Sequence, residues 1–325
     1  MAKARLFLIG LFLFQAGSLF AQQRFIHSVS GTSSSQGAIW ATKDLGLFEK
    51  YGLNVDLVLI PGGARGMQAL LGGSVQSADS DGVGPINAVL RGGDAVIVAG
   101  LSNKHLFKFV VRKEIREPRN LLGKKIGVAN FGGSNEFAVL MALKKWNVPR
   151  DGVTVVAAGS SALRLAAMEK GGLDATELPY DQALAGARMG LKILADMPSL
   201  ITAFPDKVIT VRRSFLEKDR DTVKRFLEAL CEGIFQFNTN KERAVAILAR
   251  HLHQMDPKVL EETYNIYGRV FPLPPRVERE GMRDILDQIQ RSGQKADFNL
   301  DRFLDQSVID DLEKEGFFKR FSRKD

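Results

Sequence analysis

Hydroxyl and glycine residues recur in the first half of the chain wherever a predicted strand gives way to a predicted helix. A serine run follows the first predicted strand (residues 24–30), and paired glycines follow the second (residues 53–60). Free backbone N–H groups at the start of a helix, together with hydroxyl groups, bind a carboxylate, a sulfonate or a polarised carbonyl without a buried counter-ion. The candidate ligand-binding residues of this half are Ser33, Ser34, Ser35, Gly62, Gly63, Asp79 and Ser80.

A later stretch of the chain, residues 131–181, offers a similar set and adds two aromatic residues. An aromatic ring at a strand end can stack on, or enclose, an apolar or aromatic part of a ligand. The candidate residues here are Phe131, Gly133, Ser134, Asn135, Ser160, Tyr180 and Asp181. Most of these residue types also have a structural role that the sequence leaves open. Serines cap helices, glycines form tight turns, and aromatic rings pack in cores.

Charged residues at the same strand ends bear on the charge of the ligand. Arg65 follows the first glycine pair, where it is suited either to pair with an anionic ligand or to stand in solvent on the first turn of a helix. Asp79 and Asp81 would repel a dianion unless they cap helices. A ligand with both an acid and an amine or ring N–H would reconcile these charges. We therefore expect Asp79→Asn to weaken such a ligand and to spare a simple anion.

The residues needed for catalysis or for metal binding are sparse. The two late histidines, His251 and His253, lie two residues apart in a predicted helix, where their side chains face apart. The sequence contains no His-Glu-x-x-His, Gly-x-Ser-x-Gly, P-loop or Cys-x-x-Cys motif. Cys231, the single cysteine, lies in the apolar stripe of a predicted helix, where a buried thiol is expected. We predict a binding protein with no catalytic residue, no metal and no cofactor.

The elements that position the candidate residues form two α/β units. In residues 37–81 a helix, a strand, a glycine loop, a second helix and a second strand follow one another. A second unit begins near Leu121, and a double glycine ends a helix before a strand in each unit. In open α/β sheets, ligands lie in the crevice beyond the carboxyl ends of the strands. Loops that converge from two such units are expected to hold the ligand between them.

Three segments carry a resemblance to a known family: residues 37–44, the run Leu45-Gly46-Leu47-Phe48-Glu49-Lys50-Tyr51-Gly52-Leu53, and Gly72-Gly73-Ser74-Val75. Over residues 24–250 the chain resembles the periplasmic substrate-binding proteins of ABC importers, in the branch that takes up sulfonates, taurine, nitrate and thiamine-pyrimidine precursors. The resemblance implies a type II periplasmic-binding-protein fold, in which two α/β lobes are joined by a two-strand hinge. Lobe one would comprise residues 24–108 and 206–325, including C-terminal helices, and lobe two residues 109–205.

The resemblance also implies a mechanism and partners. The two lobes would close over a small organic molecule, anionic or heteroaromatic, and the closed monomer would dock on a membrane permease and its ATPase. Two other interpretations stay open. One is an enzyme on the same fold, of the thiamine-pyrimidine or menaquinone-pathway type, and the other is a sensor subunit that presents its ligand to a receptor. The thiamine-pyrimidine enzyme carries a cysteine-rich motif, which a chain with Cys231 alone does not supply.

The N-terminus and the net charge bear on location. Residues 1–21 have the pattern of a secretory signal peptide: Lys3 and Arg5, then the apolar residues 6–14, then small residues before a cleavage site after Ala21. A membrane anchor is the alternative, but the apolar run is shorter than the ~20 residues that a span requires. We predict a periplasmic protein. The formal charge of +8 is spread along the chain, with no stripe of basic and aromatic residues, so nucleic acid is not an expected partner.

Overall fold

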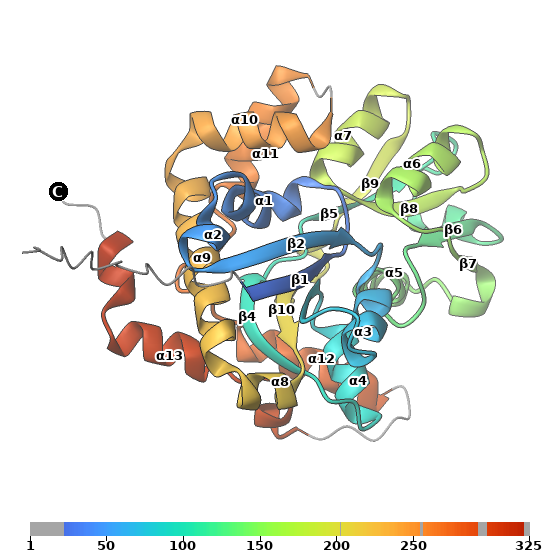
Figure 1. Cartoon of the computed structure of the whole chain (residues 1–325). Coiled ribbons are helices and arrows are strands. Elements are labelled where there is room, and N and C mark those ends of the chain that lie inside the picture. The colour runs from blue at the N-terminus through green and yellow to red at the C-terminus, as the bar shows by residue number, and fades with distance from the viewer. Residues whose placement is uncertain (1–22, 202, 254–255, 292–297, 322–325) are drawn as a thin grey trace, which may run out of the picture.

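The computed structural model describes residues 23–201, 203–253, 256–291 and 298–321, and it places them in two α/β lobes (Figure 1). The predicted signal peptide, residues 1–21, lies outside the described residues. Each lobe is built on a five-stranded sheet that contains both parallel and antiparallel pairs. The predicted fold class, two α/β lobes, is therefore confirmed.

The sheet of lobe one has the spatial order β2-β1-β3-β10-β4. Its strands are β1 (Gln23–Val29), β2 (Leu53–Leu59), β3 (Ser77–Ser80), β4 (Val96–Ser102) and β10 (Lys207–Val211). β1 is parallel to β2 and β3, whereas β10 is antiparallel to both β3 and β4. The parallel strands therefore end at the same edge of the sheet at which β10 begins.

Helices cover both faces of this sheet (Figure 1). They are α1 (Gly37–Asp44), α2 (Leu47–Lys50), α3 (Gly63–Leu71), α4 (Val83–Leu90), α8 (Arg213–Lys218), α9 (Arg220–Thr239), α10 (Lys241–Leu252), α11 (Pro257–Tyr267), α12 (Arg279–Arg291) and α13 (Ser307–Lys314). Successive residues of β4 point to opposite faces. Ile97 joins the core beneath α3 and α4, while Val98 joins the core beneath α1 and α9. Since both faces are buried, the strand is an unbroken run of buried residues.

Two glycines allow α1 to lie close against the long helix α9. A Cβ at Gly37 would lie 2.5 Å from the ring of Phe237, and a Cβ at Gly233 would lie 1.9 Å from the hydroxyl of Thr42. Only glycine avoids both contacts without moving a helix. This packing fixes the start of α1, and with it the serine run that precedes the helix.

The sheet of lobe two has the spatial order β7-β6-β8-β5-β9. Its strands are β5 (Phe107–Val111), β6 (Lys125–Val128), β7 (Thr154–Ala157), β8 (Ala175–Pro179) and β9 (Lys192–Asp196), and its helices are α5 (Ser134–Lys145), α6 (Ser161–Glu169) and α7 (Tyr180–Arg188). β6 is parallel to β7 and β8, and β5 is antiparallel to β8 and β9. The topology therefore repeats that of lobe one, with β5 in the place of β10.

The chain crosses between the sheets twice, through residues 103–106 and residues 197–206. The strands predicted for the hinge, residues 109–112 and 204–212, correspond to β5 and β10, but each lies within a single sheet. The crossings themselves are the short segments that precede these strands. The lobe boundaries given above stay a prediction.

The C-terminal segment packs against lobe one. The backbone N–H of Ile97 donates to the carbonyl of Phe303 at 2.8 Å, and that of Gly100 donates to Pro275 at 2.8 Å.

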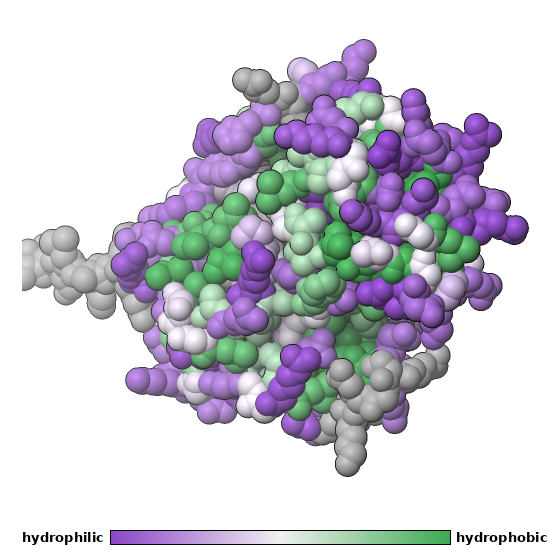
Figure 2. Space-filling view, turned by 90° about the vertical axis from the view of Figure 1, so that its right-hand side faces the viewer, coloured by the Kyte–Doolittle hydropathy of each residue, from purple (hydrophilic) through white to green (hydrophobic). Residues whose placement is uncertain are grey.

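Among the described residues, no helix combines the length and the apolar composition needed to cross a membrane. On the face that Figure 2 turns to the viewer, hydrophilic side chains alternate with small apolar patches. Exposed apolar residues of lobe two include Leu122, Leu163 and Met189.

Candidate functional site

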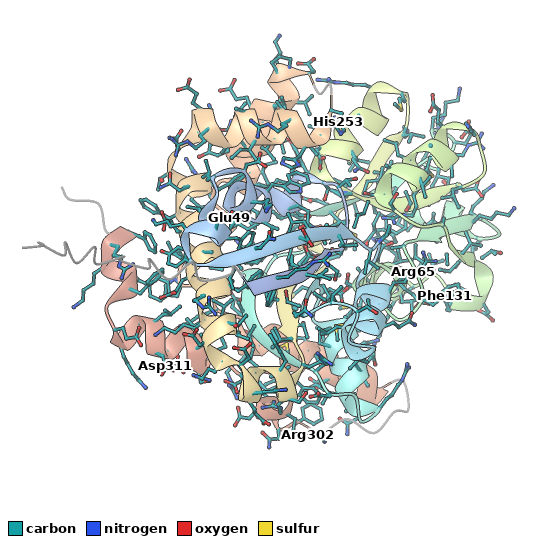
Figure 3. The ribbon with its side chains drawn as sticks, viewed as in Figure 1. Glu49, Arg65, Phe131, His253, Arg302 and Asp311 are labelled. Carbon is teal, nitrogen blue, oxygen red and sulfur yellow. The ribbon has the colours of Figure 1, made fainter. Side chains whose placement is uncertain are left out.

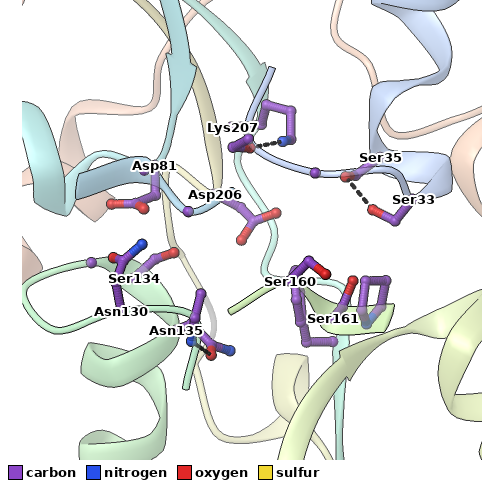
Figure 4. Close-up of a pocket in the computed structure, with 18 of the residues that line it drawn as sticks. Ser33, Ser35, Asp81, Asn130, Ser134, Asn135, Ser160, Ser161, Asp206 and Lys207 are labelled. Atoms are coloured by element: carbon purple, nitrogen blue, oxygen red, sulfur yellow. Dashed lines mark hydrogen bonds between the residues drawn. The ribbon is translucent and has the colours of Figure 1, made fainter. Parts of the chain in front are cut away.

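A cleft lies between the two lobes, where the strands of both sheets end (Figure 4). Its cavity volume is about 90 Å³. Such a space admits a small molecule and is well below the volume of pockets for drug-sized ligands. The lining residues are Ser30, Gly31, Ser33, Ser35, Gln36, Gly62, Gly63, Asp81, Phe107, Ala129, Asn130, Gly133, Ser134, Asn135, Ser160, Ser161, Arg164, Pro179, Asp206 and Lys207.

Lobe one contributes the loops that follow its parallel strands β1, β2 and β3, the last of which brings Asp81. The loop after β1 brings Ser33 and Ser35, whose hydroxyl groups lie 2.9 Å apart. The loop after β2 brings Gly62 and Gly63, at the start of α3. No side chain caps the N-terminus of α3, so backbone N–H groups of its first turn are open to a ligand.

Lobe two contributes the first turns of two helices. The N-terminus of α5, at Gly133, Ser134 and Asn135, also has no side-chain cap. Asn135 uses its Oδ1 atom to accept a hydrogen bond from the N–H of Ala129 at 2.9 Å, which ties the helix to the end of β6. The N-terminus of α6 is capped by Ser160, whose Oγ accepts from the N–H of Leu163 at 3.3 Å. Helix N-termini from both lobes thus converge on the cleft.

The antiparallel strands bring the remaining residues. β10 starts at the edge where β3 ends, because Val208 pairs with Ser80, and this register places Lys207 next to Asp81. In lobe two, Phe107 pairs with Pro179 in the same way. The residues that begin β5 and β10 therefore face the cleft, although they stand at the N-terminal ends of their strands.

Lys207 is neutralised by Asp79 within the wall of the cleft. The Nζ atom lies 3.3 Å from each carboxylate oxygen of Asp79 and donates to the hydroxyl of Ser30 at 3.1 Å. Asp79 is fully buried and Lys207 is 6% exposed. Buried opposite charges at this distance offset one another. The pair therefore adds little net charge to the site.

Arg164 is a buried cation whose hydrogen-bond partners are neutral. Its guanidinium donates to the hydroxyl of Thr176 at 2.9 Å and to the carbonyls of Gly159 at 2.6 Å and Glu177 at 3.0 Å. The side chain lines the cleft and is 2% exposed. Burial lowers the pKa of Arg164 to about 10, and the charge of Glu177 opposes part of that shift, so the group stays protonated at neutral pH. No carboxylate of the described residues forms a salt bridge with it.

The lining includes many of the residues predicted from the sequence. The structure brings together Ser33, Ser35, Gly62, Gly63, Gly133, Ser134, Asn135 and Ser160. It places Ser34, Asp79, Ser80, Phe131, Tyr180 and Asp181 outside the lining.

Asp79 and Ser80 lie outside the lining because the third strand is displaced from its predicted position. The sequence pattern predicts a strand over residues 75–78, whereas β3 spans Ser77–Ser80. Both side chains are therefore buried in the sheet, and Asp81 is the first residue beyond it. Asp79 is bound to Lys207, so the expectation that Asp79→Asn acts directly on the ligand is not supported by this geometry.

Phe131 and the pair Tyr180–Asp181 lie elsewhere for different reasons. Phe131 is 54% exposed, with its ring on the surface of the loop before α5 (Figure 3). Tyr180 starts α7, where Lys108 lies over its ring at 5.2 Å. Asp181 is buried beside Ser34, and the Oδ1 atom of Asp181 and the hydroxyl of Ser34 each lack a hydrogen-bond partner. Ser34 and Asp181 thus meet between the lobes, outside the lining of the cleft.

Several lining residues were absent from the sequence prediction. Phe107, Asp206 and Lys207 belong to the starts of the antiparallel strands, whereas the prediction used only the ends of parallel strands. Arg164 lies one turn inside α6, where an arginine is normally solvated. The sequence does contain a signal for Asp206 and Lys207, which is the predicted second hinge strand. A strand that enters a sheet from the other lobe must start at the cleft, so its first residues are candidates for the lining.

The remaining histidine and cysteine positions do not join the cleft. His251 stacks on Trp40 with ring centroids 4.6 Å apart, and its Nε2 atom lies 3.1 Å from the carboxylate of Asp44. Cys231 is fully buried in α9, and burial raises the pKa of its thiol well above the usual range. Among the described residues, no group of three or more His, Cys, Asp and Glu side chains is arranged to hold a metal ion.

Comparison with known proteins identifies the family of this chain. The model of the family described as NMT1/THI5 like matches residues 34–244, which is more than half of the chain. The chain belongs to the NMT1/THI5-like family. The matched residues include all the lining residues of the cleft except Ser30, Gly31 and Ser33.

Individual relatives of this NMT1/THI5-like protein are named as binding proteins. It is 28% identical to the taurine-binding periplasmic protein of Escherichia coli (strain K12) over 210 residues, which are 63% of this chain and 64% of that protein. A protein of Brucella abortus (strain 2308) with the name "Putative binding protein BAB2_1146" is 29% identical over 213 residues, 64% of this chain and 65% of the relative. The chain thus spans just under two thirds of the length of the curated relatives that it matches.

Solved structures of binding proteins share the fold of this NMT1/THI5-like protein. The alkanesulfonate-binding protein SsuA from Xanthomonas axonopodis pv. citri aligns with a TM-score of 0.71 at 18% identity, over 86% of this chain and 95% of that chain. A ligand-binding component of an ABC-type import system from Staphylococcus aureus also aligns with a TM-score of 0.71, at 16% identity, over 89% and 98% of the two chains. The fold is therefore that of the SsuA-like periplasmic binding proteins, as predicted.

Proposed function

We propose that this protein is the extracytoplasmic solute-binding subunit of an ABC importer and that it captures a small organic anion between its lobes. The observation that carries the proposal is Arg164, a buried guanidinium in the cleft that hydrogen-bonds to neutral oxygens only. A buried cation is stabilised by a direct ionic partner. An anionic ligand supplies that partner when it enters the cleft.

The helix N-termini support the same ligand charge. The first turns of α3 and α5 face the cleft without side-chain caps, and the positive ends of their dipoles favour an anion. Hydroxyl groups of Ser33, Ser35 and Ser161 are placed to donate to further ligand oxygens. A carboxylate or a sulfonate has the charge and the oxygen geometry that these groups satisfy.

The location and partners in this proposal rest on the sequence and on the relatives. The predicted leader, residues 1–21, directs the chain across the inner membrane. Its relative in Escherichia coli is named as periplasmic, and the Staphylococcus aureus structure is named as a component of an import system. The partners are then a membrane permease and an ATPase, and the binding subunit is a monomer that closes by rotation about the two crossings.

Binding fits the residues of the cleft better than catalysis does. The cleft contains serines but no histidine among its lining residues to activate one of them. Cys231, the alternative nucleophile, is enclosed in α9. A sensor that presents its ligand to a receptor would use the same cleft, and importer genes beside this one would favour transport over sensing.

The experiment that tests the proposal is a thermal-shift screen of the protein without residues 1–21. The screen compares sulfonates, aliphatic and aromatic carboxylates, nitrate and pyrimidines. A ligand at 100 times its dissociation constant stabilises the folded state by about 2.7 kcal/mol, which raises the midpoint by several degrees. We expect one class of organic anion to produce this shift. A shift with neutral or cationic compounds alone, or turnover of a bound compound, would contradict the proposal.

A further inference from the structure

A cluster of buried charges lies beside the cleft and includes one of its lining residues. His105 is fully buried, and its two ring nitrogens face two carboxylates. The Nδ1 atom forms a short hydrogen bond with Asp206, and the Nε2 atom lies 3.2 Å from Glu177. Glu177 in turn accepts a hydrogen bond from the amide of Asn135 at 2.8 Å. His105 thus connects two lining residues, one directly and one through Glu177.

The ring of His105 carries a positive charge in this environment. A neutral imidazole has one donor and one acceptor, whereas two carboxylates require two donors. Burial alone lowers the pKa of His105, but the charges of Glu177 and Asp206 outweigh burial and raise the pKa to about 10. The ring also stacks on Phe107, with centroids 4.4 Å apart, and meets the edge of Phe204. Contacts on all sides therefore fix its position.

The cluster joins the two places at which the chain crosses between the lobes. His105 lies in the first crossing, residues 103–106, and Asp206 is the last residue of the second. Glu177 belongs to β8 of lobe two. Because the imidazolium belongs to the first crossing and binds one group from the second crossing and one from lobe two, its hydrogen bonds set the orientation of Asp206 relative to both walls of the cleft.

Asp206 has a carboxylate oxygen that is left for a ligand. Its Oδ1 atom is bound to His105, and the carboxylate points into the open centre of the cleft (Figure 4). Asp79 is occupied by Lys207. Asp81 accepts hydrogen bonds from the N–H groups of residues 83 and 84 through its Oδ1 atom, and its Oδ2 atom lies beside Gly63 in the wall of the cleft.

We propose that the carboxylate of Asp206 accepts a hydrogen bond from a donor group of the ligand, and that the imidazolium of His105 holds Asp206 in the orientation for this contact. This inference rests on the proposed function, because it assumes that the cleft binds a solute. It narrows the ligand class to small molecules that carry an ammonium, amide or hydroxyl donor in addition to an anionic group. Asp206 is then a specificity-determining residue, and His105 is a positioning residue that does not contact the ligand.

Pairs of probes that differ only in the donor test the specificity of Asp206. Taurine is compared with ethanesulfonate, and β-alanine with propionate, by calorimetry on the full mature protein. We expect the amino compound of a pair to bind at least tenfold more tightly, and Asp206→Asn to remove most of that preference. The compound without the amine should bind within about twofold of its original affinity. Equal loss for both members of a pair, or no preference in the unmodified protein, would overturn the inference.

The role of His105 is tested with His105→Gln, and His251→Gln serves as the matched control. We expect His105→Gln to reduce the donor preference in the same direction as Asp206→Asn, and the double variant to lose no more than Asp206→Asn alone. His251 is bound to Asp44 in lobe one, outside the cleft lining, so His251→Gln should leave the preference for the amino compound unchanged. Additive losses in the double variant would show that His105 does not act through Asp206.

A ligand-free measurement separates failure of this inference from failure of the proposed function. In protein labelled with ¹⁵N in histidine, both ring nitrogens of His105 should appear protonated from pH 5 to pH 9, and Asp206→Asn should change their signals. A neutral ring at pH 7, or no change in that variant, would overturn the positioning role even if no probe binds. If the rings behave as expected and no organic anion binds, the proposed function fails instead.

Discussion

The side-chain amide of Asn130 in lobe two donates a hydrogen bond to the carbonyl of Pro61 in lobe one, at 3.3 Å. Both residues border the cleft. Asn130 is one of its lining residues, and so are Gly62 and Gly63, which directly follow Pro61. A Cβ at Gly133 of lobe two would lie 3.9 Å from the backbone nitrogen of Ala64 in lobe one, so the two backbones are also close there. The lobes therefore touch at the mouth of the cleft, and this arrangement is a closed one.

Gly62 makes this contact sterically feasible, and its replacement should prevent full closure. A Cβ at Gly62 would lie 1.8 Å from the Nδ2 atom of Asn130. We expect Gly62→Ala to weaken binding of the ligand found by the screen by at least about tenfold, because the closed form becomes less populated. The measurement is the dissociation constant, together with small-angle scattering of the variant with and without ligand.

Two further variants separate the steric effect from backbone strain. Gly62 has a φ of +85°, so an alanine there is also strained. Gly132 has a φ of +79° but no atom within 4 Å of a built Cβ, so Gly132→Ala reproduces the strain without the clash. We expect it to retain affinity. Asn130→Ala added to Gly62→Ala should restore part of the closure, and equal affinities for Gly62→Ala and Gly132→Ala would contradict the steric explanation.

The fold was predictable from the sequence because its signals are local. A β-branched run between two glycine breaks predicts a strand over residues 53–60, and β2 spans Leu53–Leu59. The double glycine at Gly72 and Gly73 ended α3 as expected, since Gly73 has the positive φ of a helix terminator. The third strand, β3, begins two residues later than predicted. After Gly73 and Ser74, two further residues belong to neither a helix nor a strand before β3 begins.

The site was only partly predictable, for a physical reason. Residues such as Gly62 and Ser134 precede helices, and this local position already places them at a strand end. The roles of Asp206 and Lys207 depend instead on partners far away in sequence: His105 for the first and Asp79 for the second. The strand direction that brings them to the cleft follows from the antiparallel pairing of β10 with β3, which no local pattern encodes.

Arg164 should be the residue on which anion binding depends most. We expect Arg164→Gln to weaken an organic anion by at least roughly thirtyfold, because removal of one partner of a buried ionic contact costs about 2 kcal/mol or more. Arg164→Lys keeps the charge but loses the planar fork, so its loss should be smaller. Calorimetry with the ligand from the screen measures both.

The exposed arginine Arg65 provides the control for these variants. It lies on the first turn of α3, outside the cleft lining (Figure 3). Arg65→Gln should leave the dissociation constant within about twofold. Because Arg164 also holds the carbonyls of Gly159 and Glu177, circular dichroism must first show that its variants are folded. Folded Arg164→Gln with unchanged affinity would remove the main support for an anionic ligand.

Cys231 should be unreactive in the folded protein. Its side chain is fully buried within α9, and burial raises the pKa of the thiol, so the reactive thiolate is scarce at neutral pH. We expect a thiol-specific reagent at pH 8 to label the native protein far more slowly than the protein unfolded in guanidinium chloride. Rapid labelling under native conditions would show that α9 opens, and it would reopen the question of a nucleophilic cysteine.

Asp181 should make the protein less stable as the pH rises from about 4 to about 6. Burial raises the pKa of Asp181 to about 6, and nearby backbone N–H groups offset only part of this effect. The folded state therefore retains a proton that the unfolded state has released, so stability is present at low pH and decreases through this window. The shift corresponds to a loss of about 3 kcal/mol above pH 6, to order of magnitude.

The variant Asp181→Asn tests this effect, because asparagine resembles the protonated acid. The difference in free energy of unfolding between the variant and the unmodified protein, measured with urea from pH 4 to pH 8, should increase in favour of the variant and then level off above pH 6. His105 and other titrating groups affect both proteins equally and cancel in the difference. A flat profile for Asp181→Asn would mean that Asp181 is hydrated or paired in solution, and that the contact between Ser34 and Asp181 opens readily between the lobes.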